Sequence, residues 1–236
     1  MQRLRIWRPC SQRAAPSLDP QVVRQRIVAS LGKLPRGNYH PNPLPELSFP
    51  TSTVEVTERD LPTNYVQGVF TAPALASPDL YPMRVATSIL QNRLFVEIRA
   101  KRNLSYAPDA FLWTQGSNLG GVSVSSTDAN QSVRIMLDEM ARLQAELISQ
   151  DELKGTIQHY LTRYYLGQET NAAQAGELAQ AELLGGGWRN ATVFMDKISA
   201  VTPADVQRVA QKYMRHIRFV VLGNPKSIDP KVFTGD

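Results

Sequence analysis

The histidines and the single cysteine are the side chains that could bind a catalytic metal or act as nucleophiles. A hydrolytic zinc site needs about three protein ligands and a general base, and often has two histidines four residues apart on a helix. The chain has only His40, His159 and His216, and none has a second histidine within helical reach. Cys10 alone can form neither an intrachain disulfide nor a cysteine metal cage. The sequence therefore predicts no metal site in this chain.

Other patterns that indicate catalysis are also missing from the sequence. There is no Gly-x-Ser-x-Gly elbow, and the glycines at 120–121 and 185–187 match neither a P-loop nor a dinucleotide fingerprint. The adjacent carboxylates at 138–139 and 151–152 would diverge by about 100° on a helix, so we interpret them as solvated faces or helix caps. We expect no catalytic residue of the chain's own, and instead a module that grips a substrate or a partner.

Composition places the chain among ordinary globular proteins. It has 236 residues, 42% of them hydrophobic and 20% charged, which is enough for one large domain or two small ones. Much of the net charge of +5 comes from arginines before residue 14, and the only dense internal basic cluster is Arg99, Lys101 and Arg102. We therefore expect no nucleic-acid partner. No apolar stretch approaches the roughly 20 residues that span a bilayer, so we expect no membrane span.

The first part of the chain differs in composition from the rest. Apolar residues recur at helical spacing in residues 19–31, after an Asp-Pro start, and predict a helix. Prolines at 41, 43, 45 and 50 follow and are typical of an extended connector. We interpret residues 1–49 as an N-terminal tail, helix and connector that resemble the end of a preceding domain, and residues 50–236 as the folded domain.

Hydrophobic periodicity in residues 50–236 predicts an α+β fold. Alternation and β-branched residues predict strands at 53–57, 64–71, 106–114, 119–126 and 218–222. Helical periodicity and capping residues predict helices at 77–99, 133–147, 150–166, 171–184, 192–198 and from 202 to about 214. Because hairpins and helices are segregated, we expect an antiparallel sheet with helices packed on one face.

The most distinctive stretch runs from Asn92 to Ala107, NRLFVEIRAKRNLSYA. A helix that ends at Arg99 and a strand that begins at Tyr106 would be joined by a short loop, which could direct both side chains to one spot. A guanidinium and a phenol hydroxyl placed there could stabilise a developing oxyanion. The plainer alternative is that Arg99 caps the helix C-terminus through its charge and Tyr106 is a strand aromatic.

This stretch resembles the second-domain signature of the pitrilysin, insulinase and mitochondrial processing peptidase family, Arg-Leu-Phe-x-x-Ile/Leu-Arg-x-Lys-x-x-Leu-x-Tyr. The resemblance extends from about residue 50 to 225 and includes Asp60-Leu-Pro and Val201-Thr-Pro-Ala-Asp-Val206. In that family of zinc metallopeptidases, two homologous domains enclose a chamber. The first carries a His-x-x-Glu-His zinc motif, and the second supplies an arginine and a tyrosine that reach the bound peptide. This sequence is similar only to the second, C-terminal domain, which has no zinc.

The resemblance implies roles for two residues and a division of labour between two domains. Arg99 would grip a carbonyl or carboxylate oxygen of the peptide, and Tyr106 would donate to the scissile carbonyl oxygen. The chain would hold no cofactor, and zinc would lie in a homologous partner domain or subunit with the His-x-x-Glu-His motif. The implied function is the peptide-binding, non-zinc half of a zinc metalloendopeptidase.

Two alternatives stay open at this point. One is a non-catalytic structural or assembly subunit of the same fold, like the core subunits of respiratory cytochrome complexes. The other is an unrelated α+β binding module. The residues do not distinguish a bacterial periplasmic from a cytoplasmic location.

Overall fold

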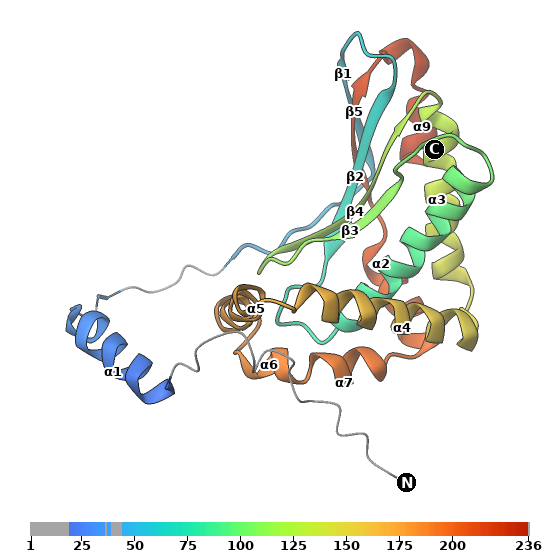
Figure 1. Ribbon diagram of the computed structural model, residues 1–236. Coiled ribbons are helices and arrows are strands. Elements are labelled where there is room, and N and C mark those ends of the chain that lie inside the picture. The colour runs from blue at the N-terminus through green and yellow to red at the C-terminus, as the bar shows by residue number, and fades with distance from the viewer. Residues whose placement is uncertain (1–18, 36, 39–43, 236) are drawn as a thin grey trace. The chain divides into compact units, whose positions relative to one another are not determined.

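The computed structural model describes residues 19–35, 37–38 and 44–235 and divides the chain into two compact units, Met1–Pro43 and Leu44–Asp236 (Figure 1). Cys10 and His40 lie outside the described residues. The first unit contains helix α1 (Pro20–Ser30) and a 3₁₀ turn, η2 (Leu31–Lys33). The Asp19 carboxylate accepts a hydrogen bond from the Gln21 amide at 2.9 Å, and Pro20 occupies the first helical position, so the predicted Asp-Pro helix start is present. The predicted domain boundary at residue 50 stays a prediction.

The second unit is built on a five-stranded sheet with the order β1-β5-β2-β4-β3. Its strands are β1 (Thr53–Glu58), β2 (Asn64–Ala72), β3 (Asp109–Leu112), β4 (Asn118–Ser126) and β5 (Arg218–Gly223). The pairs β2–β4, β2–β5 and β3–β4 are antiparallel, as predicted, whereas β1–β5 is parallel. A parallel pair needs a long crossover, and here the connection contains nearly the whole unit. The sheet is therefore mixed, with antiparallel pairing dominant.

Helices cover one face of this sheet, which confirms the predicted α+β architecture. In Figure 1, α2 (Leu80–Leu94), α3 (Ala129–Ala145) and α9 (Pro230–Thr234) lie on the same side of the strands. A second group lies beyond one end of the sheet: α4 (Gln150–Gly167), α5 (Asn171–Leu184), α6 (Arg189–Thr192) and α7 (Phe194–Ser199). Helix α8 (Pro203–Tyr213) packs against α2 and α3, and a 3₁₀ turn, η4 (Pro225–Ser227), follows β5.

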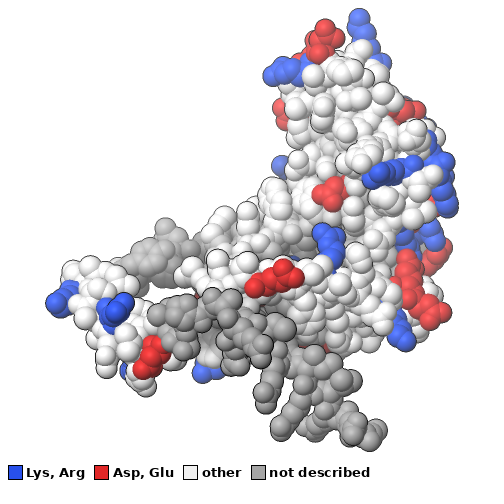
Figure 2. Space-filling view, viewed as in Figure 1, with Lys and Arg blue, Asp and Glu red and all other residues white. Residues whose placement is uncertain are grey.

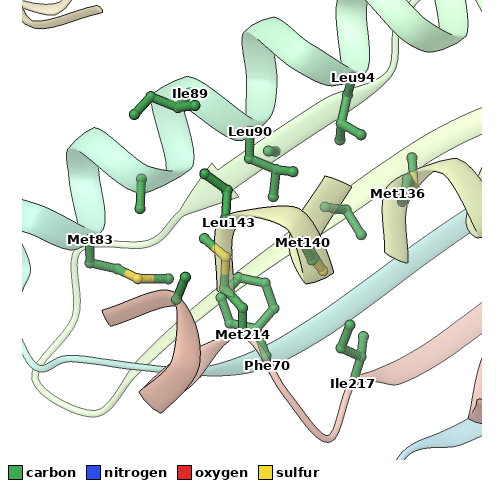
Figure 3. Packing of buried hydrophobic residues seen from close by; sticks show 14 of the residues in the cluster. Phe70, Met83, Ile89, Leu90, Leu94, Met136, Met140, Leu143, Met214 and Ile217 are labelled. Atoms are coloured by element: carbon green, nitrogen blue, oxygen red, sulfur yellow. The ribbon is translucent and has the colours of Figure 1, made fainter. Parts of the chain in front are cut away.

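The hydrophobic core lies between the sheet and the helices (Figure 3). Met83 and Leu90 of α2, Met136 and Leu143 of α3, and Phe70 of β2 are all fully buried in it. The helix predicted at 133–147 buries its apolar positions as far as Leu143, but Leu147 lies beyond the end of α3 and is 61% exposed. Fully burying each such side chain contributes about 1.5–3 kcal/mol, so this packing fixes the position of α2 and of the segment that continues it.

The ends of several helices differ in detail from the predictions. Helix α8 begins with the predicted capping box, in which Thr202 and Asp205 bond each other's backbone amides. Helix α2 begins at Leu80, later than predicted, because Ser77 accepts a hydrogen bond from the Asp79 amide in a preceding turn. The helix predicted at 192–198 is two short helices, α6 and α7, which follow a turn where Gly186 and Gly187 have φ of 77° and 122°.

Candidate functional site

The helix that carries the distinctive motif changes its winding before it ends. Residues Phe95–Ala100, labelled η3, continue α2 as a π-helical turn, in which the Lys101 amide donates to the Val96 carbonyl at 2.9 Å. Such wide turns are rare and frequently occur at functional sites. Phe95 and Arg99 lie four residues apart and therefore on one face of the helix. The Arg99 guanidinium lies 5.1 Å from the centre of the Phe95 ring.

Arg99 and Tyr106 come together, as the spacing predicts. The Arg99 guanidinium carbon lies 3.9 Å from the centre of the Tyr106 ring, and the Tyr106 side chain is 79% exposed. An exposed cation–π contact contributes only about 0.5–1 kcal/mol, so the pair stabilises the fold little. Tyr106 is exposed and Arg99 is half-buried, so an incoming ligand can reach both side chains.

The two other cations of the basic cluster are neutralised locally. Lys101 and Arg102 both form ion pairs with Glu97, each at 2.6 Å, and these contacts hold the pKa of Glu97 below its usual value. Among the described residues, no side-chain or backbone oxygen accepts a hydrogen bond from the Arg99 guanidinium. Arg99 is therefore the cation of this cluster that is available to an external carbonyl or carboxylate.

The prediction that Tyr106 opens a strand is wrong. Strand β3 begins at Asp109, and Tyr106 lies in the loop between η3 and β3. Pro108 has no N–H to donate to a β ladder, which is the physical reason why the strand starts after it. The helix end is closed by its own backbone: Asn103 adopts φ 52°, and its amide donates to the Arg99 carbonyl at 3.1 Å.

The loop that carries Tyr106 is anchored on both sides. On one side, the buried Ser126 hydroxyl of β4 donates to the Leu104 carbonyl at 2.9 Å. On the other side, the Gln91 side-chain amide donates to the Pro108 carbonyl at 3.2 Å, and its oxygen accepts a hydrogen bond from the Ala110 amide. Neither anchor is predicted from the sequence. The available signal was Gln91 itself, a polar residue on the core-facing helix immediately before the motif.

Arg93, the first arginine of the motif, has a structural role. It forms a two-pronged interaction with Glu152 of α4, with both hydrogen bonds at 2.9 Å, and lies 3.6 Å from Glu139 of α3. Glu139 is only 5% exposed and also pairs with Arg142. The interpretation of Glu139 and Glu152 as solvated or capping carboxylates is therefore wrong for Glu139. The adjacent carboxylates at 138–139 and 151–152 point apart on their helices, but one of each pair, Glu139 or Glu152, contacts Arg93.

A second polar cluster fixes the start of α2. The Asp79 carboxylate accepts hydrogen bonds from Arg208 at 2.7 Å, Lys212 at 2.8 Å and the Tyr213 hydroxyl at 2.9 Å. Burial alone would raise the pKa of Asp79, but these hydrogen bonds outweigh it and lower the pKa to about 2. Asp79 and Arg208 also line a cavity of about 510 Å³, whose walls do not include the Arg99 and Tyr106 side chains. We interpret this cluster as a link between α2 and α8.

The described residues contain no group of three or more His, Cys, Asp or Glu side chains that could hold a metal ion. His159 lies exposed on α4, and His216 is exposed just before β5. Figure 2 shows basic and acidic side chains intermixed on the second unit. None of the helices within the described ranges is long and apolar enough to cross a membrane.

Comparisons with known proteins identify the family of this chain. The family model described as the peptidase M16 inactive domain matches residues 17–160. An uncharacterized zinc protease from Streptomyces coelicolor is 27% identical over 127 residues, which are 52% of this chain and 27% of the relative.

Solved structures show the same fold. The peptidase M16 inactive domain from Pseudomonas fluorescens aligns with a TM-score of 0.78 and 16% identity, over 90% of this chain and 53% of that one. A chain of Complex III2 from Candida albicans aligns with a TM-score of 0.68 and 18% identity, over 78% of this chain and 49% of that one. This chain thus spans about half or less of the length of these proteins. Because the family model matches more than half of its residues, the protein belongs to the peptidase M16 family as an inactive domain, which confirms the resemblance seen in its sequence.

Proposed function

We propose that this domain is the peptide-binding, zinc-free half of a processing peptidase or insulinase-type zinc metalloendopeptidase. It completes an active site together with a homologous domain or subunit that carries a His-x-x-Glu-His motif. Membership in the inactive-domain family supports this division of labour. Its substrate is a peptide, bound through Arg99 and Tyr106.

The observation that carries the proposal is the contact between half-buried Arg99 of η3 and exposed Tyr106, which lies on an anchored loop. An exposed tyrosine that contributes little to the core has no structural need for anchors on both sides of its loop, yet Gln91 and Ser126 supply them. Preorganised donors are what oxyanion stabilisation requires, because the donors then need no reorganisation during the reaction. The anchoring is therefore better explained by a binding role than by stability.

The chemistry follows from the two side chains. The Tyr106 hydroxyl donates a hydrogen bond to the scissile carbonyl oxygen, and this bond strengthens as negative charge develops there. The Arg99 guanidinium presents a planar set of donors to another peptide carbonyl or to a carboxylate. Its stacking on Tyr106 limits the motion of both groups. Zinc bound in the partner domain would supply the activated water.

A structural or assembly subunit is the second candidate. The fold match to a chain of Complex III2 favours it, because that structure shows this architecture within a large assembly. In this case Arg99 and Tyr106 would contact a protein partner and no peptide would be cleaved. The two candidates differ in whether the Arg99 guanidinium affects substrate affinity or only assembly.

The test combines this chain with a homologous domain that carries the His-x-x-Glu-His motif and measures cleavage of unstructured peptides. Arg99→Lys keeps the positive charge but loses the planar fork, so we expect KM to rise by about tenfold. Lys101→Ala and Arg102→Ala are the matched controls, because both side chains already pair with Glu97, and their KM should stay within about twofold of wild type. A complex that cleaves no peptide and that Arg99→Lys weakens would favour the assembly role.

A further inference from the structure

A second, smaller cavity adjoins the cavity beside Asp79. It has a volume of about 80 Å³ and is lined by residues of α2, α4, α5, α6 and α7. Four residues line both cavities, namely Leu75, Tyr81, Gly185 and Asn190. The smaller cavity has room for roughly five to eight waters, or for the polar end of a small organic molecule. The larger one, of about 510 Å³, can receive the rest of such a molecule.

On the α2 side, the smaller cavity is lined by a cation without a counter-ion. Arg84 is half-buried, and its guanidinium carbon lies 5.4 Å from the centre of the Phe194 ring. Its Nη1 donates to the Tyr160 hydroxyl at 3.2 Å, and its Nε is buried without a partner. Within the described ranges Nη2 forms no hydrogen bond, yet it is not one of the buried unpaired atoms, so it can reach the cavity. A partly buried charge without a partner is costly, so this cation favours an anionic group in the cavity.

On the α5 side, the same cavity is lined by hydrogen-bond acceptors. Half-buried Glu177 accepts a hydrogen bond from the Tyr164 hydroxyl at 2.6 Å, and no described cation forms an ion pair with it. Burial and the Glu177 carboxylate raise the pKa of Tyr164, which therefore stays a donor. Gln180, one turn further along α5, donates its amide N–H to Thr114, which leaves its side-chain oxygen as a second acceptor. These acceptors favour a cationic donor in the cavity.

Helix α5, which forms this acidic wall, is held by few contacts. None of its residues is buried, and its side-chain hydrogen bonds to other elements come from Glu177 and Gln180. It ends at the turn where Gly186 and Gly187 have positive φ, a conformation that tolerates little besides glycine. A wall with so little buried surface can move to admit a ligand. A ligand that bonds both sides of the cavity would then link α5 to α2.

We propose that this cavity binds a small zwitterion of the α-amino acid class, with its carboxylate on Arg84 and its ammonium on Glu177 and Gln180. A ligand with only a carboxylate would add a second negative charge beside Glu177. A ligand with only an amine would leave Arg84 unpaired. Neither Arg99 nor Tyr106 lines this cavity, so the site goes beyond the proposed peptide-binding function.

Binding of L-leucine to the whole chain, measured by isothermal titration calorimetry, tests this proposal against two matched molecules. N-acetyl-L-leucine lacks the ammonium, and L-leucine amide lacks the carboxylate. We expect a Kd of about 1 mM or tighter for L-leucine. Each derivative should bind at least about tenfold more weakly, because it leaves one charge of the cavity without its partner.

Two variants assign the contacts. Arg84→Met keeps a similar stem but removes the guanidinium, so it should weaken L-leucine binding by about tenfold or more. Glu177→Gln keeps an acceptor for Tyr164 but loses the charge. It should weaken L-leucine binding and strengthen that of N-acetyl-L-leucine, a change of preference that a general loss of stability would not produce. Arg163→Met and Glu169→Gln are the controls, because they change the charge equally outside the cavity lining and should leave both affinities unchanged.

The outcomes are decided on the chain alone. No detectable binding of L-leucine at about 10 mM, or equal affinities for L-leucine and its two derivatives, would overturn the proposal. Affinities in Arg84→Met and Glu177→Gln that match those of the controls would also overturn it. Should Arg84→Met unfold, the three ligands on the wild-type chain and the Glu177→Gln preference still decide. Because the assay needs neither zinc nor a partner domain, either result leaves the Arg99 and Tyr106 roles to their own test.

Discussion

The Gln91 amide should control the order of the loop that carries Tyr106. Its two hydrogen bonds, to the Pro108 carbonyl and from the Ala110 amide, join α2 to the start of β3. Gln91→Leu keeps a similar size but removes both. A neutral hydrogen bond contributes about 0.5–1.5 kcal/mol net, so the two together should lower the free energy of opening this loop by about 1–3 kcal/mol. Amide exchange in residues 104–110 should then accelerate by roughly 5–150-fold.

Native-state hydrogen exchange measured by mass spectrometry checks this expectation on the chain alone. Gln180→Leu is a matched control, because the Gln180 amide donates to the Thr114 carbonyl at 3.2 Å, beyond the other end of β3. Gln180→Leu should leave the amide exchange rates of residues 104–110 unchanged. Unchanged exchange in the Gln91→Leu loop, or equal acceleration by both variants, would refute the anchoring. Peptide affinity should fall in Gln91→Leu if the Arg99–Tyr106 geometry depends on the anchor.

Other predictions concern the polar clusters and the metal. Because the pKa of Asp79 is lowered to about 2, its ion pairs stabilise the fold fully above about pH 4 and are lost as the pH falls toward 2. Asp79→Asn should therefore lower the free energy of unfolding by about 2 kcal/mol at pH 7 and by less near pH 2. Denaturant unfolding at the two pH values measures this difference. Arg93→Lys should lower stability by about 1–3 kcal/mol by breaking the two-pronged Glu152 contact beside buried Glu139, with no change in the KM of the folded complex. The isolated chain should retain no stoichiometric zinc after dialysis, and one tightly bound ion per chain would contradict this expectation.

The sequence predicts most of the fold because its local patterns agree with the final packing. Alternation in β5 and the Met/Leu stripe of α3 each have one buried face, and periodicity detects such faces directly. The parallel pairing of β1 with β5 is different. This pair joins the two ends of the second unit. Local sequence patterns do not indicate which distant strand becomes a neighbour. Strand β3 starts later than predicted because Pro108 has no N–H to donate to the ladder, although the β propensity around Tyr106 indicates a strand.

The candidate site is predictable only in part, for a similar reason. The spacing from Arg99 to Tyr106 predicts that the two side chains meet, because both residues lie in one short continuous segment. The residues that hold the pair in place do not lie in that segment. Ser126 comes from β4, and the partners of Arg93 come from α3 and α4. Side chains such as Glu139 look solvated in a sequence because their burial depends on helices that only the folded chain brings together.

The turnover of Tyr106→Phe decides whether Tyr106 takes part in peptide cleavage. The variant removes one hydroxyl from a side chain that is 79% exposed, so the melting temperature should stay the same. In the complex with the His-x-x-Glu-His domain, loss of the oxyanion donor should lower kcat by roughly 10²–10³-fold, or about 3–4 kcal/mol. Wild-type turnover by a folded Tyr106→Phe variant in an active complex would contradict the account.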